Sequence, residues 1–155
     1  MNIDDRKRST SAAALMAATT FGLLNLLWEV AQLPFYTLWK QGTLGSIAFA
    51  IAHCTVGDVL IGLFAASLSI VLTRFLVPRH SAAGASFLVV FVIFGIGYTV
   101  FSEWLNVFVW KSWAYSDLMP TIPPLGTGLS PLLQWLLVPI ATYFIVFWRT
   151  CRHQV

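Results

Sequence analysis

Four long apolar stretches alternate with shorter polar segments along the chain. They cover residues of about 12–33, 44–77, 82–110 and 129–148. Each reaches the roughly 20 mainly apolar residues that a helix needs to cross the hydrocarbon core of a bilayer. Pro34 and Pro78 close the first two stretches, and Pro131 lies in the first turn of the fourth, where proline is tolerated. The pattern predicts an all-α integral membrane protein with four transmembrane helices in a bundle, forming one domain over residues 1–155.

The composition supports a membrane protein and argues against a soluble one. The chain is 58% hydrophobic and only 10% charged, whereas soluble domains carry about 25% charged residues. Its two cysteines, Cys54 and Cys151, follow no zinc-site spacing and predict no disulfide framework. The basic residues are scattered rather than gathered into a patch, so the expected partner is the lipid bilayer and not a nucleic acid.

The basic residues also predict how the helices are oriented. Loops rich in Lys and Arg stay on the cytoplasmic side of a membrane. If both termini share one side, seven of the nine Lys and Arg residues fall there, and only Lys40 and Lys111 fall on the other. We therefore expect cytoplasmic N- and C-termini in a multi-pass protein of a cell membrane, with a bacterial inner membrane as the expected location. The seven are Arg6, Lys7, Arg8, Arg74, Arg79, Arg149 and Arg152.

Three of the six acidic residues, Glu29, Asp58 and Glu103, lie inside the apolar stretches. A charged side chain at the bilayer centre costs about 2.5–3.5 kcal/mol on insertion scales and usually marks a functional site. His53 lies in the second stretch, and on the predicted topology all four residues fall in the outer half of the bilayer. They form the predicted catalytic set. The alternative for each is a structural hydrogen bond between helices.

Amide side chains accompany the carboxyls. Asn25, Glu29 and Gln32 follow the spacing i, i+4, i+7, which places them on one face of a helix. The third stretch repeats this spacing with Thr99, Glu103 and Asn106. The repetition raises the hypothesis of a tandem duplication, although the second and fourth stretches do not match each other. The predicted supporting polar residues are Asn25, Gln32, Asn106 and Gln134.

Aromatic residues lie beside the polar ones and in the longest loop. We expect Trp28, Trp104 and Trp135 to anchor the helices at the membrane interface. The alternative is an apolar pocket, for which the predicted aromatic lining is Trp28, Trp104, Trp135 and Tyr115. The loop of residues 111–130 is rich in Pro, Gly and aromatic residues. That composition predicts a structured lid over the polar layer rather than a flexible linker.

Two functions remain open on this pattern. Buried carboxyls and a histidine favour acid–base chemistry on an apolar lipid or isoprenoid-like substrate. The alternative is a proton- or metal-binding transport or accessory subunit, which with four spans would need a homodimer or a larger membrane complex. No haem or nucleotide motif is present, so no cofactor is predicted. A divalent metal stays open because Glu, Asp and His are suitable ligands, although no Glu-x-x-His spacing occurs.

One stretch resembles a known family. The stretch with Trp113, Tyr115, Gly128, Pro131 and Pro139 loosely resembles the end of the small integral-membrane carotenoid (lycopene) cyclases. The resemblance covers residues 113–139 and implies acid-catalysed chemistry on a carotenoid-like hydrocarbon. The adjacent acidic pair of that family is missing, and Gln134 and Trp135 occupy the comparable place.

Overall fold

The computed structural model describes residues 3–76 and 83–152, with side chains for residues 10–75 and 84–149. Within this part of the chain, four helices are long and apolar enough to cross a membrane. The predicted fold class is therefore confirmed as a mainly helical chain with four candidate spans. These spans are Thr10–Phe35, Leu44–Phe75, Gly84–Val109 and Leu129–Arg149.

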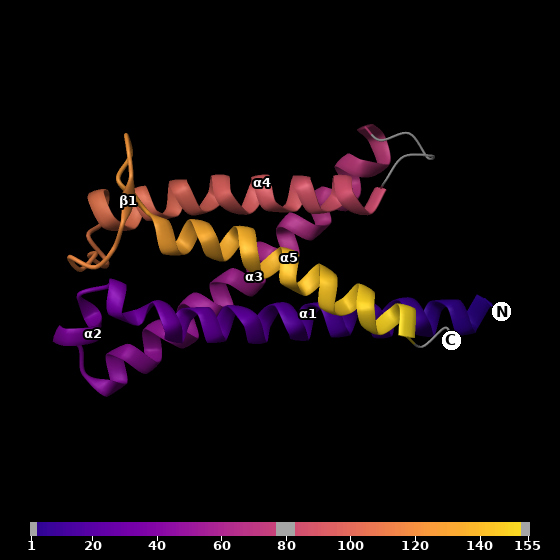
Figure 1. Ribbon diagram of the computed structural model, residues 1–155, viewed down its shortest axis with the longest axis horizontal. Helices are drawn as coiled ribbons and strands as arrows, with labels where there is room; N and C mark the ends of the chain where they lie inside the picture. Colours follow the sequence, from indigo (N-terminus) through magenta and orange to yellow (C-terminus); the bar gives the residue numbers. More distant parts are fainter. Residues whose placement is uncertain (1–2, 77–82, 153–155) are drawn as a thin grey trace.

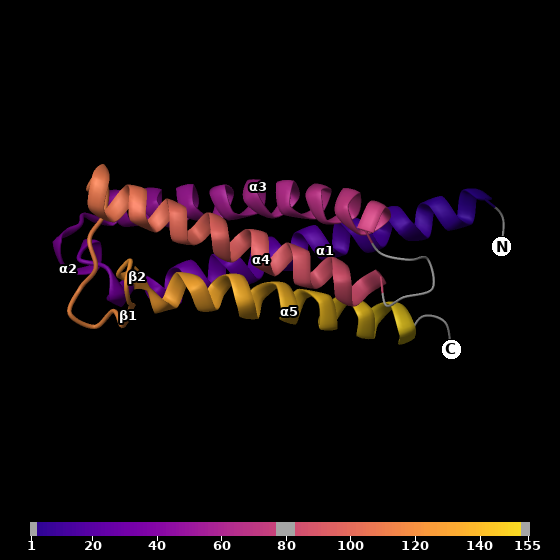
Figure 2. The same cartoon turned by 90° about the horizontal axis from the view of Figure 1, so that it is seen from above.

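Neighbouring long helices run antiparallel, and the four pack in a ring. They are α1 (Ile3–Gln32), α3 (Leu44–Leu76), α4 (Ala83–Glu103) and α5 (Leu129–Arg152). Each contacts two neighbours, in the cyclic order α1–α3–α4–α5. Helix α1 begins and α5 ends at the same end of the bundle, and the short connecting elements gather at the opposite end (Figures 1 and 2). We call the end with the short elements the loop end.

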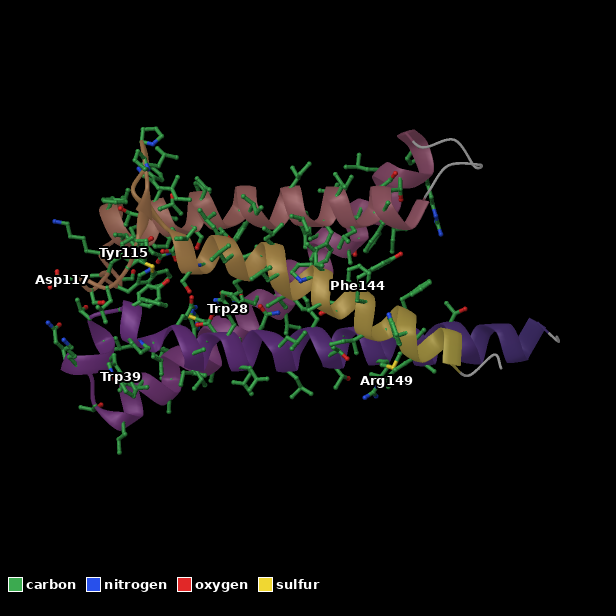
Figure 3. All side chains as sticks on the ribbon, in the orientation of Figure 1. Trp28, Trp39, Tyr115, Asp117, Phe144 and Arg149 are labelled. Atoms are coloured by element: carbon green, nitrogen blue, oxygen red, sulfur yellow. The ribbon has the colours of Figure 1, made fainter. Side chains whose placement is uncertain are left out.

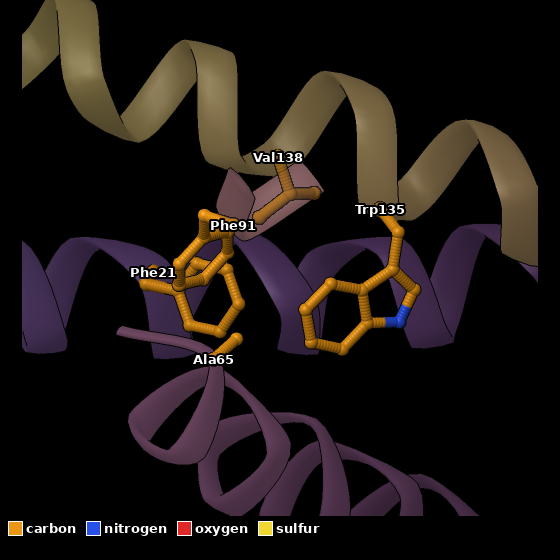
Figure 4. Close-up of a cluster of buried hydrophobic side chains, with 5 residues drawn as sticks. All are labelled: Phe21, Ala65, Phe91, Trp135 and Val138. Carbon is orange, nitrogen blue, oxygen red and sulfur yellow. The ribbon is translucent and has the colours of Figure 1, made fainter. Parts of the chain in front are cut away.

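An apolar core fills the middle of the bundle. Its buried residues are Phe21, Ala65, Phe91, Trp135 and Val138, with at least one from each long helix (Figure 4). The Phe21 and Phe91 rings meet edge to face with centroids 5.8 Å apart, an arrangement that aromatic pairs prefer. Outside this core many large apolar side chains remain exposed. Exposed apolar side chains all around a helix bundle are what contact with lipid requires.

The loop end is built from short elements that follow α1 and α4. After α1 come a 3₁₀ turn, η1 (Leu33–Phe35), and a single helical turn, α2 (Leu38–Gln41). Helix α4 continues as a π-helix, η2 (Trp104–Val109). The long loop that follows contains a small hairpin of β1 (Thr121–Ile122) and β2 (Thr127–Gly128).

Hydrogen bonds hold the long loop against the end of α1. The Ser116 backbone N–H donates to the Phe35 carbonyl at 2.8 Å, and its hydroxyl donates to the Pro34 carbonyl at 2.8 Å. The Thr37 N–H donates to the Ala114 carbonyl at 3.0 Å. The loop is thus structured, as its Pro-rich and aromatic composition predicts. It covers the loop end of the bundle, immediately above the polar residues of the helices.

Candidate functional site

The polar stripe of α1 faces the interior of the bundle. Asn25, Glu29 and Gln32 are all buried, and Asn25 is only 1% exposed. The Gln32 amide donates to Glu29 Oε1 at 2.8 Å. The Asn25 amide donates to the Phe21 carbonyl one turn earlier, also at 2.8 Å, so its side-chain oxygen is free to accept from another helix. The i, i+4, i+7 spacing therefore presents several oxygen acceptors to the neighbouring helices.

Gln134 on α5 joins three helices through one nitrogen. Its Nε2 lies 2.9 Å from Asn25 Oδ1 and 3.1 Å from Glu29 Oε1, both on α1. The same nitrogen lies 2.8 Å from Asp58 Oδ2 on α3. The side chain is 2% exposed, so water does not substitute for these contacts. Because an amide nitrogen carries only two hydrogens, it cannot fully satisfy three oxygens.

Two of these three oxygens belong to Glu29 and Asp58, which we call the carboxyl pair. The two side chains are within hydrogen-bonding reach of each other, and no described Lys, Arg or His partners either of them. Two ionised carboxylates at this separation would repel one another. One proton shared by the carboxyl pair would supply a further donor and remove one of the two charges. Cys54, a free thiol one turn before Asp58, also reaches Glu29.

A third carboxyl, Glu103, connects the bundle to the long loop. It ends the α-helical part of α4, just before the π-helix, and π-helical turns are frequent at functional sites. The Tyr115 hydroxyl donates to Glu103 Oε2 and accepts from the Gly128 backbone N–H at 2.9 Å. Burial raises the pKa of the Tyr115 phenol above its ordinary value, and the bond to Glu103 raises it further. Tyr115 therefore stays neutral and fastens the loop to α4.

Tyr36 lies against Tyr115, with ring centroids 5.7 Å apart. Burial raises its pKa well above the ordinary value, and the negative charge of Glu103 adds to the effect. Figure 3 shows Tyr115 and Asp117 at the loop end, and Phe144 and Arg149 toward the other end.

We call the buried polar residues around the carboxyl pair the polar cluster. Ser130 belongs to it, although the sequence pattern did not single this residue out. Its hydroxyl donates to Gln32 Oε1 at 2.9 Å and accepts from the Trp28 indole N–H at 3.3 Å. A signal was present, because Ser130 precedes Gln134 by four residues and so shares its helical face. Of the predicted aromatic lining, Trp28 donates to Ser130, whereas Tyr115 bonds to Glu103 and Gly128.

The other predicted site residues lie apart from the carboxyl pair. Trp135 belongs to the apolar core, and Trp104 is 43% exposed on the outside of the bundle. The Asn106 amide donates to the Ser102 carbonyl of its own helix at 2.9 Å. His53 is exposed and stacks on Phe49, with ring centroids 5.5 Å apart. The structure thus brings together Asn25, Glu29, Gln32, Asp58 and Gln134, and places His53 on the outer face of α3.

Across the described side chains, no three or more His, Cys, Asp or Glu residues are grouped so as to hold a metal ion. Four apolar helices with a few buried polar groups are the features of a multi-pass membrane protein. Comparison with protein-family models, with curated proteins and with solved structures gave no match. The chemistry of the site must therefore be argued from its own residues.

Proposed function

We propose that this chain is a membrane enzyme that performs acid–base chemistry on an apolar, lipid- or isoprenoid-like substrate. The observation that carries the proposal is the carboxyl pair, in which Glu29 and Asp58 share the amide of Gln134 without a described cation. A general acid or base needs a group that holds and releases a proton within reach of the substrate. A pair that holds one proton between two oxygens in a water-poor site meets that need.

The hydrogen bonds support different roles for the two carboxyls. Glu29 accepts from both Gln32 and Gln134, and donors of this kind favour the ionised form. Asp58 accepts from Gln134 alone, so its ionised form is less stabilised and it retains the proton more readily. It is also only partly buried, so it is the more accessible of the two carboxyls and the better proton donor. In the proposed reaction Asp58 adds its proton to a carbon–carbon double bond. Glu29 then removes a proton from a neighbouring carbon, so the double bond moves and the pair regains its single proton.

The proposed orientation places both termini in the cytoplasm of a bacterial cell. Arg74 and Arg149 lie near the ends of the helices opposite the loop end, whereas Lys40 and Lys111 belong to the loop end. This distribution supports the positive-inside assignment. The carboxyl pair then lies in the half of the bilayer away from the cytoplasm, and the long loop acts as a lid that excludes water from it.

A proton-binding accessory subunit is the second candidate, and the closed hydrogen-bond network favours it. Ser130, Gln32 and Trp28 satisfy one another inside the cluster. Below them the apolar core fills the bundle, which argues against a continuous polar path for transport. Such a subunit would act within a homodimer or a larger complex rather than alone.

Hydrogen exchange into lipid tests the enzyme proposal. The full chain is reconstituted in liposomes with membrane lipids of the cells that make it, transferred to D₂O, and the lipids are analysed by mass spectrometry. We expect deuterium in one lipid species, reduced at least tenfold by Glu29→Gln or Asp58→Asn, since general acid–base groups contribute about 10²–10⁴-fold.

The matched control is Asp117→Asn, which changes an exposed carboxyl of the lid and should leave the exchange unchanged. Circular dichroism checks that each variant remains helical. If no lipid takes up deuterium beyond protein-free liposomes, the enzyme proposal fails. A carboxyl signal in infrared difference spectra that titrates with pH and disappears in Asp58→Asn would then favour the accessory subunit.

A further inference from the structure

Tyr36, which directly follows η1, interacts electrostatically with carboxyls of two different helices. The negative charge of Glu103 on α4 acts on its phenol most strongly, and that of Glu29 on α1 acts on it as well. Glu29 and Glu103 also interact with each other. Cys54 of α3, which reaches Glu29, lies within electrostatic range of all three carboxyls. The carboxyl pair and Glu103 therefore belong to one group of titratable side chains at the loop end.

The backbone and ring of Tyr36 are held in place, whereas its hydroxyl is not. The Tyr36 N–H donates to the Leu33 carbonyl at 3.0 Å, and its backbone forms an isolated antiparallel bridge with that of Tyr115. Its ring lies against the Tyr115 ring. Within the part of the chain that the structure describes, the Tyr36 hydroxyl forms no hydrogen bond. A group that can both donate and accept is thus left without a partner, within electrostatic range of two carboxyls.

The carboxyl pair needs a route by which it exchanges its proton with water. The enzyme proposal requires such exchange for deuterium to enter from D₂O, and a proton-binding subunit requires it for binding. On one side of the pair the apolar core fills the bundle. On the other side the long loop is hydrogen-bonded to the end of α1. Polar side chains at the loop end are the path that remains, and Tyr36 contributes to it a hydroxyl that is not bound to another group.

We propose that Tyr36 is a proton relay between Glu103 and the carboxyl pair. The inference rests on the proposed function, because it describes how that site exchanges its proton. Protonated Glu103 passes its proton to the Tyr36 oxygen, directly or through one water, while the proton of the phenol moves to the Glu29 carboxylate. One O–H bond forms on the phenol as another breaks, so Tyr36 is neutral before and after the transfer.

The state of the phenol agrees with a concerted transfer. Burial and the neighbouring carboxyls raise the pKa of Tyr36 well above its ordinary value, so a separate tyrosinate is not populated near neutral pH. Rotation of the hydroxyl restores the starting state, and Glu103 regains a proton from water at the loop end. The net result is one proton moved from the loop end to the carboxyl pair.

Infrared spectroscopy of the full chain in liposomes tests the relay. After transfer to D₂O, the carboxyl band of the pair shifts as deuterium replaces its proton, and Asp58→Asn identifies this band by its loss. We expect Tyr36→Phe to slow the replacement at least about tenfold, because a positioned proton-transfer group contributes about 10²–10⁴-fold. The variant keeps the ring against Tyr115 and removes only the oxygen. Damage to the packing would have the opposite effect, since a looser loop admits water and speeds the exchange.

Tyr98→Phe is the matched control, because Tyr98 is 40% exposed on the outside of α4 and its loss of a hydroxyl should leave the exchange rate unchanged. Glu103→Gln keeps an oxygen for the Tyr115 hydroxyl and should slow the exchange as Tyr36→Phe does. If either Tyr36→Phe or Glu103→Gln exchanges as fast as the unchanged chain, the relay is overturned, whereas the protonated carboxyl pair and the proposed function stand. If no carboxyl band depends on Asp58, the pair holds no proton and both proposals fail.

Discussion

Gln134 of α5 lies within hydrogen-bonding distance of side chains on both α1 and α3. Gln134→Leu keeps a similar side-chain size but leaves oxygens of Asn25, Glu29 and Asp58 without this donor. Because a buried polar group that loses its partner costs about 1–3 kcal/mol, we expect the free energy of unfolding to fall by at least that amount. The measurement is denaturant unfolding in mixed micelles.

Ser67→Ala is the control for this loss. Ser67 is exposed, and its hydroxyl donates to the Leu63 carbonyl of its own helix at 2.9 Å. Its removal should change the free energy of unfolding by no more than about 0.5 kcal/mol. A Gln134→Leu protein as stable as the unchanged chain would show that the carboxyl pair does not depend on this amide.

The sequence predicts which polar residues lie in the apolar stretches better than it predicts which of them contact one another. The spacing of Asn25, Glu29 and Gln32 predicts a shared face, because helical periodicity is a local property. That Asp58 and Gln134 turn toward that face depends on how α3 and α5 rotate in the bundle, which periodicity does not determine. His53 lies five residues before Asp58 and hence about 140° around the helix, so it faces outward when Asp58 faces inward. The catalytic role of all four predicted residues stays a prediction.

Two glycines of α4 lie in different surroundings: Gly95 packs closely against α5, and Gly97 faces open space. A Cβ on Gly95 would lie 2.0 Å from the Trp135 ring of α5, whereas one on Gly97 would meet nothing within 4 Å. Gly95→Ala should therefore force α4 and α5 apart and lower the free energy of unfolding by about 1–3 kcal/mol. Gly97→Ala should be neutral or raise it by up to about 1 kcal/mol, because alanine favours the helix.

Thermal unfolding of the two variants in the same detergent provides the comparison. Equal stability of Gly95→Ala and Gly97→Ala would contradict the close contact between α4 and α5. The comparison reports on the packing of α4 against α5 and not on the polar residues, because Gly95 and Trp135 lie in the apolar part of the bundle.

Long elements were predicted from the sequence, and short ones were not. Stretches of 20 or more mainly apolar residues identify the four helices, and Pro34 and Pro131 lie near helix ends in the structure as expected. The π-helix η2 and the β1–β2 hairpin carry no comparable signal. Their form depends on tertiary contacts between distant segments. One example is the Tyr115 hydroxyl, which bonds to Gly128 and holds the loop against Glu103.

The cyclic order of the helices bears on the duplication hypothesis. With the order α1–α3–α4–α5, a half turn about the bundle axis would exchange α1 with α4 and α3 with α5. Helices α1 and α4 carry the two similar polar stripes, so the arrangement is compatible with a duplicated helix pair. The stripes have different partners, however. Glu29 meets Asp58 and Gln134 inside the bundle, whereas Glu103 holds the lid through Tyr115.

The orientation of the whole molecule decides which side of the membrane the lid faces. Ser112 lies in the long loop at the loop end, and Arg149 lies near the end of α5; both are exposed. In a chain carrying Cys54→Ser and Cys151→Ser, we expect a membrane-impermeant maleimide to label Ser112→Cys in intact spheroplasts. It should label Arg149→Cys only after the membrane is opened, because basic segments stay in the cytoplasm. The reverse labelling pattern would place the lid and the carboxyl pair on the cytoplasmic side, where a substrate would have to approach from the inner leaflet.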